Sequence, residues 1–122
     1  MAGYLISKNG YNPDPFMKRN YLGEFEELVL LTVAVLNNNG YGVSIMHEII
    51  RQSNRAVRLN QVHAALQRLE EKGMVKSKMG EPTRERGGRR KRLFIITAYG
   101  HQTLTEIQSL RNQMWNLMPG TN

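Results

Sequence analysis

Apolar residues recur at helical spacing in three successive segments of the chain, each bounded by polar or glycine-containing breaks. The first segment begins after Gly23 with an acidic first turn, which complements the helix dipole, and stops at the Asn-rich run 37–40. The second opens at Tyr41, and the third begins near Asn60, a residue type that favours helix N-caps, and stops at Gly73. The positions expected to face inward are Phe25, Leu28, Val29, Thr32, Val35, Leu36, Ile45, Met46, Ile49, Ile50, Val62, Ala65, Leu66 and Leu69. The sequence therefore predicts three consecutive helices that share one core.

The pattern then changes from helical spacing to alternation. Residues 74–79 alternate apolar and polar side chains, which predicts a strand with one buried face. Residues 80–88 contain a proline and three glycines and predict a hairpin turn, and the apolar run 93–97 predicts the return strand. Three helices followed by a two-stranded hairpin, or wing, are the element order of a winged helix-turn-helix. The expected fold class is α+β, mainly α, with a winged-helix domain over residues 23–97 and an N-terminal arm over 1–22.

A last helix is predicted over residues 98–118, followed by a proline and a glycine. Its apolar residues form a narrow row at steps of three and four, as in a coiled-coil seam. The row consists of Leu104, Ile107, Leu110, Met114 and Leu117. A domain of this size can hardly bury so long a helix along its whole length, so the row predicts a homodimer. The alternative is that the helix packs across the first helix of its own chain, and the two arrangements can hold at different ends.

Composition narrows the functional classes. The chain has 122 residues, enough for one domain, and 40% hydrophobic with 22% charged residues is typical of a folded protein. It contains no cysteine, which excludes disulfides, cysteine-ligated zinc and thiol catalysis and fits a reducing cytoplasm. The longest apolar run, residues 28–36, is too short to cross a bilayer, and the N-terminus lacks a signal-peptide hydrophobic segment. We therefore expect a cytoplasmic protein with no membrane partner.

Charge points to a polyanionic partner. The chain carries 17 basic and 10 acidic residues, a net charge of +7, and residues 76–92 alone contribute +6. Such a local concentration is typical of a docking surface, because solvated surfaces usually mix both signs. The wing cations expected to contact phosphates or enter the minor groove are Arg84, Arg86, Arg89, Arg90, Lys91 and Arg92.

The outer face of the third helix is hydrogen-bonding and free of bulky apolar groups, as a helix that enters a major groove requires. The residues expected to meet DNA there are Asn60, Gln61, His63, Ala64, Gln67 and Arg68. Glutamine can bond bidentately to adenine and arginine to guanine, and each such pair contributes about 1–3 kcal/mol of discrimination. Two alternatives stay open: Arg68 can pair with Glu71 or Glu24, and Asn60 and Gln61 can bind a phosphate through backbone N–H groups. The expected partner is double-stranded DNA.

Enzymatic chemistry finds little support. His47-Glu48 is half of an HExxH zinc motif, but Arg51 occupies the place of the second histidine. His63 and His101 have no carboxylate or thiol at ligand spacing, and no phosphate-cradling glycine motif or Gly-x-Ser-x-Gly elbow is present. We expect neither an enzyme nor a metal or other cofactor. The alternative function is an RNA-binding or non-specific nucleic-acid module, although the predicted binding face lacks the stacking aromatics that RNA recognition favours.

Over residues 28–104 the chain resembles the PadR family of bacterial transcriptional regulators. The resemblance is carried by four segments in order: Tyr41-Gly42, Leu66-x-Arg68-Leu69-Glu70-x-x-Gly73, Gly87-Gly88-Arg89-Arg90-Lys91 and Thr97-x-x-Gly100. The short C-terminus is similar to that of the compact subfamily with a single dimerisation helix. The resemblance implies a winged-helix fold, a dimer and a repressor that often regulates its own gene.

Some positions depart from the family pattern. His63-Ala64 stands where the family often has Tyr-Pro, and Phe94 replaces a tyrosine. In relatives that bind flat aromatic drugs, a tryptophan on the last helix lines a cavity between protomers; here Arg111 holds that place and Trp115 follows one turn later. A pocket for a small hydrophobic or aromatic effector would therefore use Arg111, Trp115 and Met118. The alternative is that these side chains are plain interface.

Overall fold

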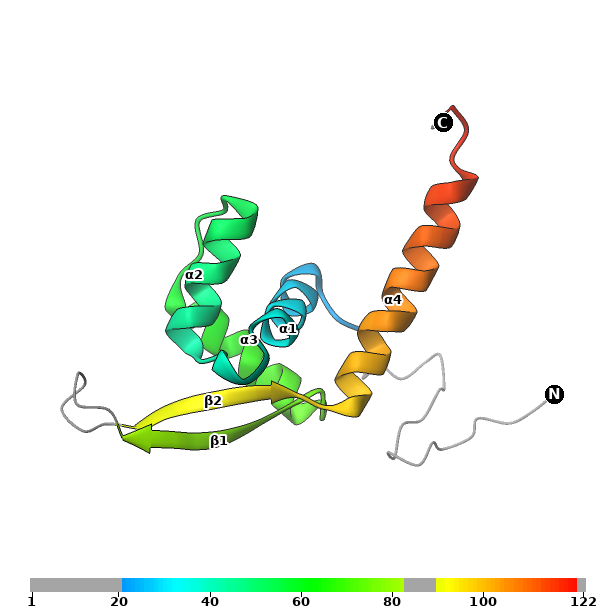
Figure 1. Cartoon of the computed structure of the whole chain (residues 1–122). Coiled ribbons are helices and arrows are strands. Elements are labelled where there is room, and N and C mark those ends of the chain that lie inside the picture. Colours follow the sequence, from blue (N-terminus) through cyan, green and yellow to red (C-terminus); the bar gives the residue numbers. More distant parts are fainter. Residues whose placement is uncertain (1–20, 83–89, 121–122) are drawn as a thin grey trace.

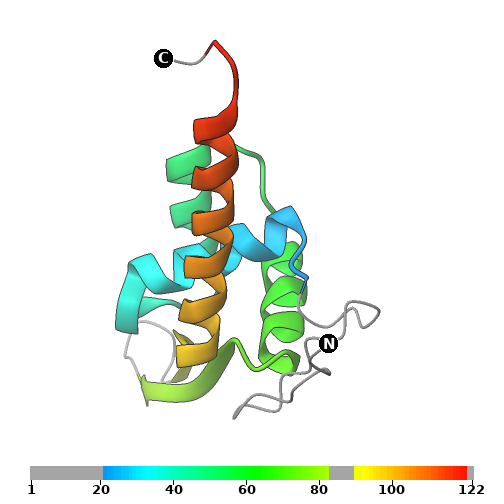
Figure 2. The same cartoon turned by 90° about the vertical axis from the view of Figure 1, so that its right-hand side faces the viewer.

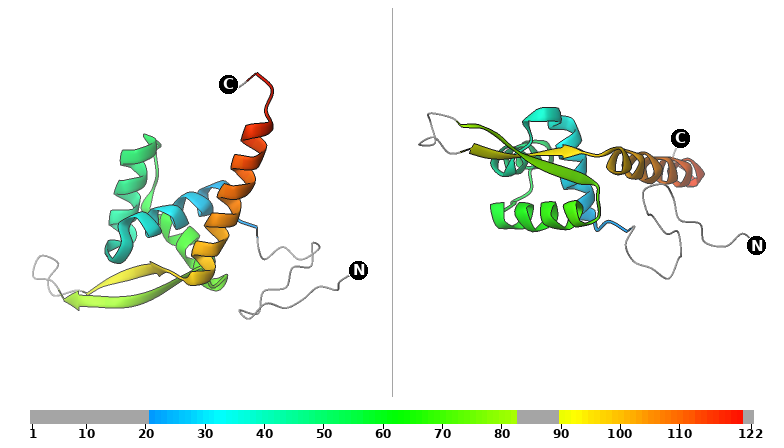
Figure 3. Two further views of the ribbon diagram at one scale, coloured as in Figure 1. Left: turned by 45° about the vertical axis from the view of Figure 1, so that its right-hand side comes forward. Right: turned by 90° about the horizontal axis from the view of Figure 1, so that it is seen from below.

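The structure, a computed structural model, describes residues 21–82 and 90–120 as a body of helices with a small two-stranded sheet along one edge (Figure 1). The elements are α1 (Glu24–Leu36), a 3₁₀ turn (Asn37–Asn39), α2 (Gly42–Ser53), α3 (Leu59–Glu71), β1 (Val75–Pro82), β2 (Arg90–Ile96) and α4 (Ala98–Leu117). This order confirms the predicted winged-helix class. The predicted arm lies outside the described residues except for its last two. Strands β1 and β2 extend from the first turn of α4 toward the opposite side of the helical body (Figure 3).

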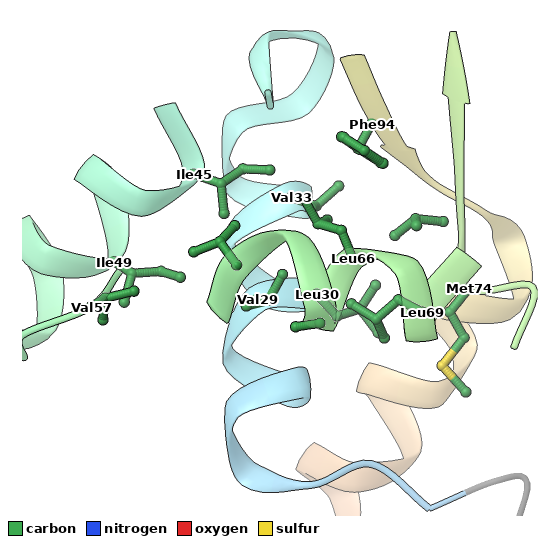
Figure 4. Close-up of a cluster of buried hydrophobic side chains, with 13 residues drawn as sticks. Val29, Leu30, Val33, Ile45, Ile49, Val57, Leu66, Leu69, Met74 and Phe94 are labelled. Atoms are coloured by element: carbon green, nitrogen blue, oxygen red, sulfur yellow. The ribbon is translucent and has the colours of Figure 1, made fainter. Parts of the chain in front are cut away.

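The core is centred on α1, which contacts α2, α3, β2 and α4 (Figure 4). Leu30 and Val33, which the sequence analysis did not place inward, are fully buried there. Val35, which it did place inward, is 60% exposed. The prediction failed at these positions because a helix covered on several sides does not show one apolar face. The buried hydrophobic residues are Val29, Leu30, Val33, Ile45, Ile49, Val57, Val62, Ala65, Leu66, Leu69, Met74, Val75 and Phe94.

Helix α3 ends at the predicted glycine. Gly73 has φ of +77°, a left-handed conformation that residues with a Cβ rarely adopt. Its N–H donates to Glu70 O at 3.0 Å and Met74 N–H donates to Leu69 O at 2.9 Å, which is the Schellman pattern. Met74 and Leu69 are both buried, so this cap also turns the chain from the helix into β1.

The start of α3 differs from the prediction. The helix begins at Leu59 with Arg58 as its N-cap, so Asn60 is the second helical residue and not the cap. The side chain of Gln61 explains this start, because its Oε1 accepts the Arg58 backbone N–H at 2.8 Å. Glutamine three residues after the cap supplies the return half of a capping box.

The wing is a two-stranded antiparallel sheet that is longer than predicted. Val75 pairs with Ile96 and Ser77 with Phe94, and the pairing extends to Pro82 and Arg90 beyond a bulge. Tyr41 adds an isolated bridge to Leu93, and Phe94 N–H donates to Gly40 O at 2.7 Å. The chain entering α2 is therefore joined to the free edge of β2.

The start of helix α4 is hydrogen-bonded to the residues that cap α3. Thr97 is its N-cap, and the Thr97 Oγ1 accepts the Gly100 N–H at 3.0 Å and donates to Gly73 O at 2.7 Å. The Thr97 N–H donates to Met74 O at 3.0 Å. A Cβ on Gly100 would overlap the Met74 carbonyl oxygen and lie 2.9 Å from the Ile96 side chain. The Thr97-x-x-Gly100 pattern therefore serves this joint.

The row of apolar residues along α4 is divided between two environments. Leu104 packs against the core and Ile107 is half-buried, whereas Leu110, Met114 and Leu117 are 56%, 61% and 74% exposed. The helix runs the height of the molecule when viewed from its own side (Figure 2), and its C-terminal end extends away from α1 and α3 (Figure 1). The N-terminal end thus packs on its own chain, as the alternative prediction had it, while the C-terminal end is apolar and exposed.

Candidate nucleic-acid interface

The two faces of α3 separate as predicted. Val62, Ala65, Leu66 and Leu69 are buried against the core. The six residues expected to meet DNA, namely Asn60, Gln61, His63, Ala64, Gln67 and Arg68, are all exposed. The helix therefore presents one continuous hydrogen-bonding surface to solvent, and the contacts of its individual side chains decide which of them are free to bind.

Arg68 is not free. Its Nε donates to Glu26 Oε2 at 2.6 Å, and Lys72 Nζ donates to the other oxygen of the same carboxylate at 2.8 Å. The sequence predicted Glu71 or Glu24 as an alternative partner of Arg68. The residue was wrong, but a carboxylate partner was predicted correctly. Glu26 takes this role because the first turn of α1 lies against α3, which no sequence spacing shows. Arg68 ties α3 to α1.

The glutamines of α3 differ in their freedom. Gln61 uses its Oε1 on the Arg58 backbone, which leaves its amide N–H groups for a ligand. Gln67 has only a long contact to Glu71, with its Nε2 3.5 Å from Oε2, and such a distance gives a weak bond. Gln67 is thus able to offer a donor and an acceptor together to one base.

A groove of about 750 Å³ separates α3 from β2. His63 and Gln67 line one wall, and Arg90, Lys91 and Arg92 line the other. The cations Arg84, Arg86 and Arg89, also predicted to bind DNA, lie outside the described residues. The groove therefore places hydrogen-bonding side chains, together with the carboxylates of Glu70 and Glu71, on the α3 wall and positive charge on the facing wall.

Two of the three cations of β2, Lys91 and Arg92, are held by neighbours inside the groove. Lys91 Nζ sits 4.1 Å from the centre of the Tyr41 ring, a cation–π contact. Arg92 Nε donates to Ser77 Oγ at 3.1 Å, and its Nη2 lies 3.7 Å from Glu70. The Ser77 Oγ in turn donates to Glu70 at 2.9 Å. These contacts tie the base of the wing to the C-terminal half of α3.

His63 lies over the start of α2. A Cβ on Gly42 would come within 2.6 Å of the His63 ring, so a glycine is needed for the imidazole to approach the backbone. The Tyr41-Gly42 pair therefore has two tasks, since tyrosine contacts Lys91 and glycine admits His63.

The Glu26 carboxylate joins α1 to α3, and its ion pairs with Lys72 and Arg68 change its pKa. Burial alone would raise the pKa of Glu26, but hydrogen bonds and charges from Lys72 and Arg68 outweigh it and hold the pKa below its usual value. A pKa lowered on folding stabilises the native state at pH above the unfolded value, and that contribution disappears as pH falls through the folded value.

We expect Glu26→Gln to lower the free energy of unfolding by about 1–2 kcal/mol at pH 7, because two charge-assisted hydrogen bonds are weakened. Urea denaturation from pH 7 down to pH 2 measures the effect, and the gap between the two proteins should close at the acid end. Glu24→Gln is the control, since that side chain is 70% exposed. A gap that stays constant with pH would contradict this role of Glu26.

The C-terminal half of α4 forms a separate apolar concavity. Arg111 does not stand free in it, because its Nη2 donates to Glu27 Oε1 at 2.9 Å. Trp115 and Met118 are 65% and 40% exposed. Together with Tyr21 and other residues they line a hollow of about 640 Å³. The three predicted pocket residues are thus brought together, with the cation already paired.

Within residues 21–82 and 90–120, no cluster of three histidines or carboxylates could hold a metal ion. Glu48, from the half motif, pairs with Arg51 at 2.7 Å. No helix in this part of the chain combines the length and apolarity needed to cross a bilayer.

Residues 30–106 match the family model of the transcriptional regulator PadR-like family. The chain belongs to this family. PadR-like proteins are transcription regulators and not enzymes, which confirms the prediction from the sequence. No curated protein sequence matches the chain.

Solved PadR-like structures share the fold at low sequence identity. A PadR family transcription regulator from hypervirulent Clostridium difficile is 20% identical with a TM-score of 0.63, over 79% of this chain and 95% of that one. A PadR-like transcriptional regulator from Bacillus cereus is 16% identical with a TM-score of 0.61, over 79% and 92%. A transcriptional regulator from Clostridium thermocellum is 23% identical with a TM-score of 0.58, over 83% and 95%. The chain therefore covers nearly the whole length of these relatives.

Proposed function

We propose that this PadR-like protein is a cytoplasmic, sequence-specific regulator that binds double-stranded DNA as a homodimer and represses transcription. The observation that carries the proposal is the groove between α3 and β2. The exposed hydrogen-bonding face of α3 suits the edges of bases in a major groove. The cations of the wing suit the neighbouring phosphates or the minor groove.

The dimer is proposed from α4. Its C-terminal end exposes Leu110, Met114, Trp115 and Leu117, an apolar surface that water would otherwise cover. Leu31 on α1 is 49% exposed and lines a second, smaller hollow together with Arg111. A second copy of the chain would cover this surface with its own α4, and the same contacts would form twice about a two-fold axis.

We further propose that a small effector molecule controls the regulator. A small hydrophobic or aromatic molecule in the hollow beside Trp115 would lie between the protomers of such a dimer and could relieve repression. The hollow of one chain is open and apolar, and Trp115 is the single tryptophan of the chain, so its fluorescence reports directly on this place.

The first experiment mixes the purified protein with sheared DNA from its own genome at about 150 mM salt, a physiological ionic strength, and sequences what is retained. A dimeric operator-binding regulator should enrich an inverted repeat with half-sites about one helical turn, or roughly 34–36 Å, apart. The absence of enrichment, with binding lost at moderate salt, would leave only counterion-driven attraction. RNA would then be the next ligand to test.

The salt dependence of DNA affinity measures how much the cations of the wing contribute to binding. If each protomer neutralises about four phosphates, the slope of log K against log salt should be about −7 for the dimer. Arg89→Ala with Arg90→Ala should reduce this slope to about −3.5 and weaken all duplexes alike. Gln67→Ala is the contrasting variant, since it should relax preference at one base position and leave the slope unchanged. A wild-type slope near zero would remove the nucleic-acid function altogether.

A further inference from the structure

Among the arginines of α2, α3 and the turn between them, one lacks the carboxylate partner that the others have among the described residues. Four arginines lie on α2, on α3 or on the turn between them, and three are paired with carboxylates. These pairs are Arg51–Glu48 at 2.7 Å, Arg55–Glu24 at 2.6 Å and Arg68–Glu26 at 2.6 Å. Among the residues that the structure describes, no carboxylate pairs with the fourth, Arg58.

The backbone of Arg58 is firmly held although its side chain is exposed. Its N–H donates to Gln61 Oε1 at 2.8 Å, and its carbonyl oxygen accepts from the backbone N–H groups of Gln61 and Val62. The preceding residue, Val57, is buried in the core (Figure 4). The Arg58 guanidinium therefore extends from a fixed point at the N-terminal end of α3.

Helix stability does not account for arginine at this position. The N-terminus of a helix carries the positive end of its dipole, so a cation there is unfavourable and an anion favourable. Arginine is also a poor N-cap, because it offers no acceptor to the first N–H groups. A cation that gains nothing from its own helix, and that no described carboxylate neutralises, is suited to an anionic or acceptor-rich ligand outside the chain.

We propose that Arg58 is a DNA-contacting residue of this regulator and supplies an arginine contact from a guanidinium that, unlike that of Arg68, is not paired with a carboxylate of the described residues. The N-terminal residues of a recognition helix are the ones that contact base edges. The chemistry recognised is a pair of acceptors in one plane, either N7 and O6 of a guanine or two oxygens of a phosphate. This inference rests on the proposed function and names a determinant of its affinity.

The test compares operator binding of the wild-type dimer with that of Arg58→Ala. We expect a loss of about 5- to 150-fold for each half-site, the range for one good arginine contact. Arg55→Ala is the matched control, because that arginine lies three residues earlier, is also exposed and is paired with Glu24. It should change binding less than threefold. Thermal unfolding of both variants shows whether the fold is intact.

The Arg58→Lys variant distinguishes a contact to a guanine from a contact to a phosphate. If Arg58 reads a guanine, the loss appears only on operators that carry one particular base pair, and lysine does not restore it, since it lacks the planar fork. If Arg58 holds a phosphate, all duplexes weaken alike, the salt slope falls by about one for each half-site, and lysine restores most of the affinity. Either result supports a contact between Arg58 and DNA.

The inference is overturned if folded Arg58→Ala binds the operator with wild-type affinity and wild-type salt slope. That result leaves the proposed function intact, because the wild-type protein still binds. Failure of the proposed function looks different, since the wild-type protein itself then enriches no operator.

Discussion

Replacing Gly100 with alanine is expected to lower the free energy of unfolding by about 3 kcal/mol, near the upper end for overpacked sites. The added methyl group would overlap the Met74 carbonyl oxygen and crowd Ile96. The backbone oxygen cannot move aside alone, because it also accepts the Thr97 N–H. Relief of the overlap would therefore displace α4 or the end of α3.

Thermal unfolding followed by circular dichroism measures this effect, and a loss of about 3 kcal/mol corresponds to roughly 10 °C or more for a domain of this size. Gly40→Ala is the matched control, since that glycine is also buried but a Cβ there would meet no atom closer than 3.5 Å. Equal melting temperatures for the two variants would show that the joint between α3 and α4 tolerates a side chain.

The second large effect concerns the exposed end of α4. Leu110→Glu combined with Met114→Glu should convert the proposed dimer to a monomer, because burying two carboxylates in an apolar interface is costly. Operator affinity should then fall by about 10²- to 10⁴-fold, the usual gain from linking two binding sites. The fold should survive, since both side chains are more than half exposed in the single chain.

Sedimentation equilibrium gives the oligomeric state, and the emission of Trp115 gives an independent measure. Trp115 is 65% exposed in one chain, so its emission should shift to the blue on dimerisation and not in the double variant. Ser109→Glu is the control, because Ser109 is exposed and lies outside the apolar row. A double variant that stays dimeric and binds the operator would contradict the role proposed for α4.

The order of elements could be predicted from the sequence because each signal is local. The glycine that ends α3 is an example, since a residue at φ of +77° favours glycine whatever surrounds it. The two faces of α3 were also predictable, because a helix with only one buried side shows its periodicity directly. Helix α1 lacked such a signal at Val35, where burial depends on which elements lie around it.

The candidate site was predictable in its location and less so in the roles of its arginines. Arg68 has the spacing of an outward-facing residue, and it does face outward, yet Glu26 neutralises it from 42 positions earlier in the chain. Arg58 stood outside the predicted helix, because asparagine two positions later is the stronger N-cap by residue type. The helix starts earlier because the Arg58 backbone N–H donates a capping hydrogen bond to Gln61 Oε1, and that bond depends on side-chain geometry.

The joint between α3 and α4 has a mechanical consequence. Thr97 and Gly100 fasten the first turn of α4 to the two residues that close α3, and Arg111 braces the same helix against Glu27 further along. A helix of 20 residues is about 30 Å long. A tilt of α4 would therefore be passed through this joint to the end of α3. In a dimer built on α4, the crossing angle of the two α4 helices would set the distance between the two recognition helices.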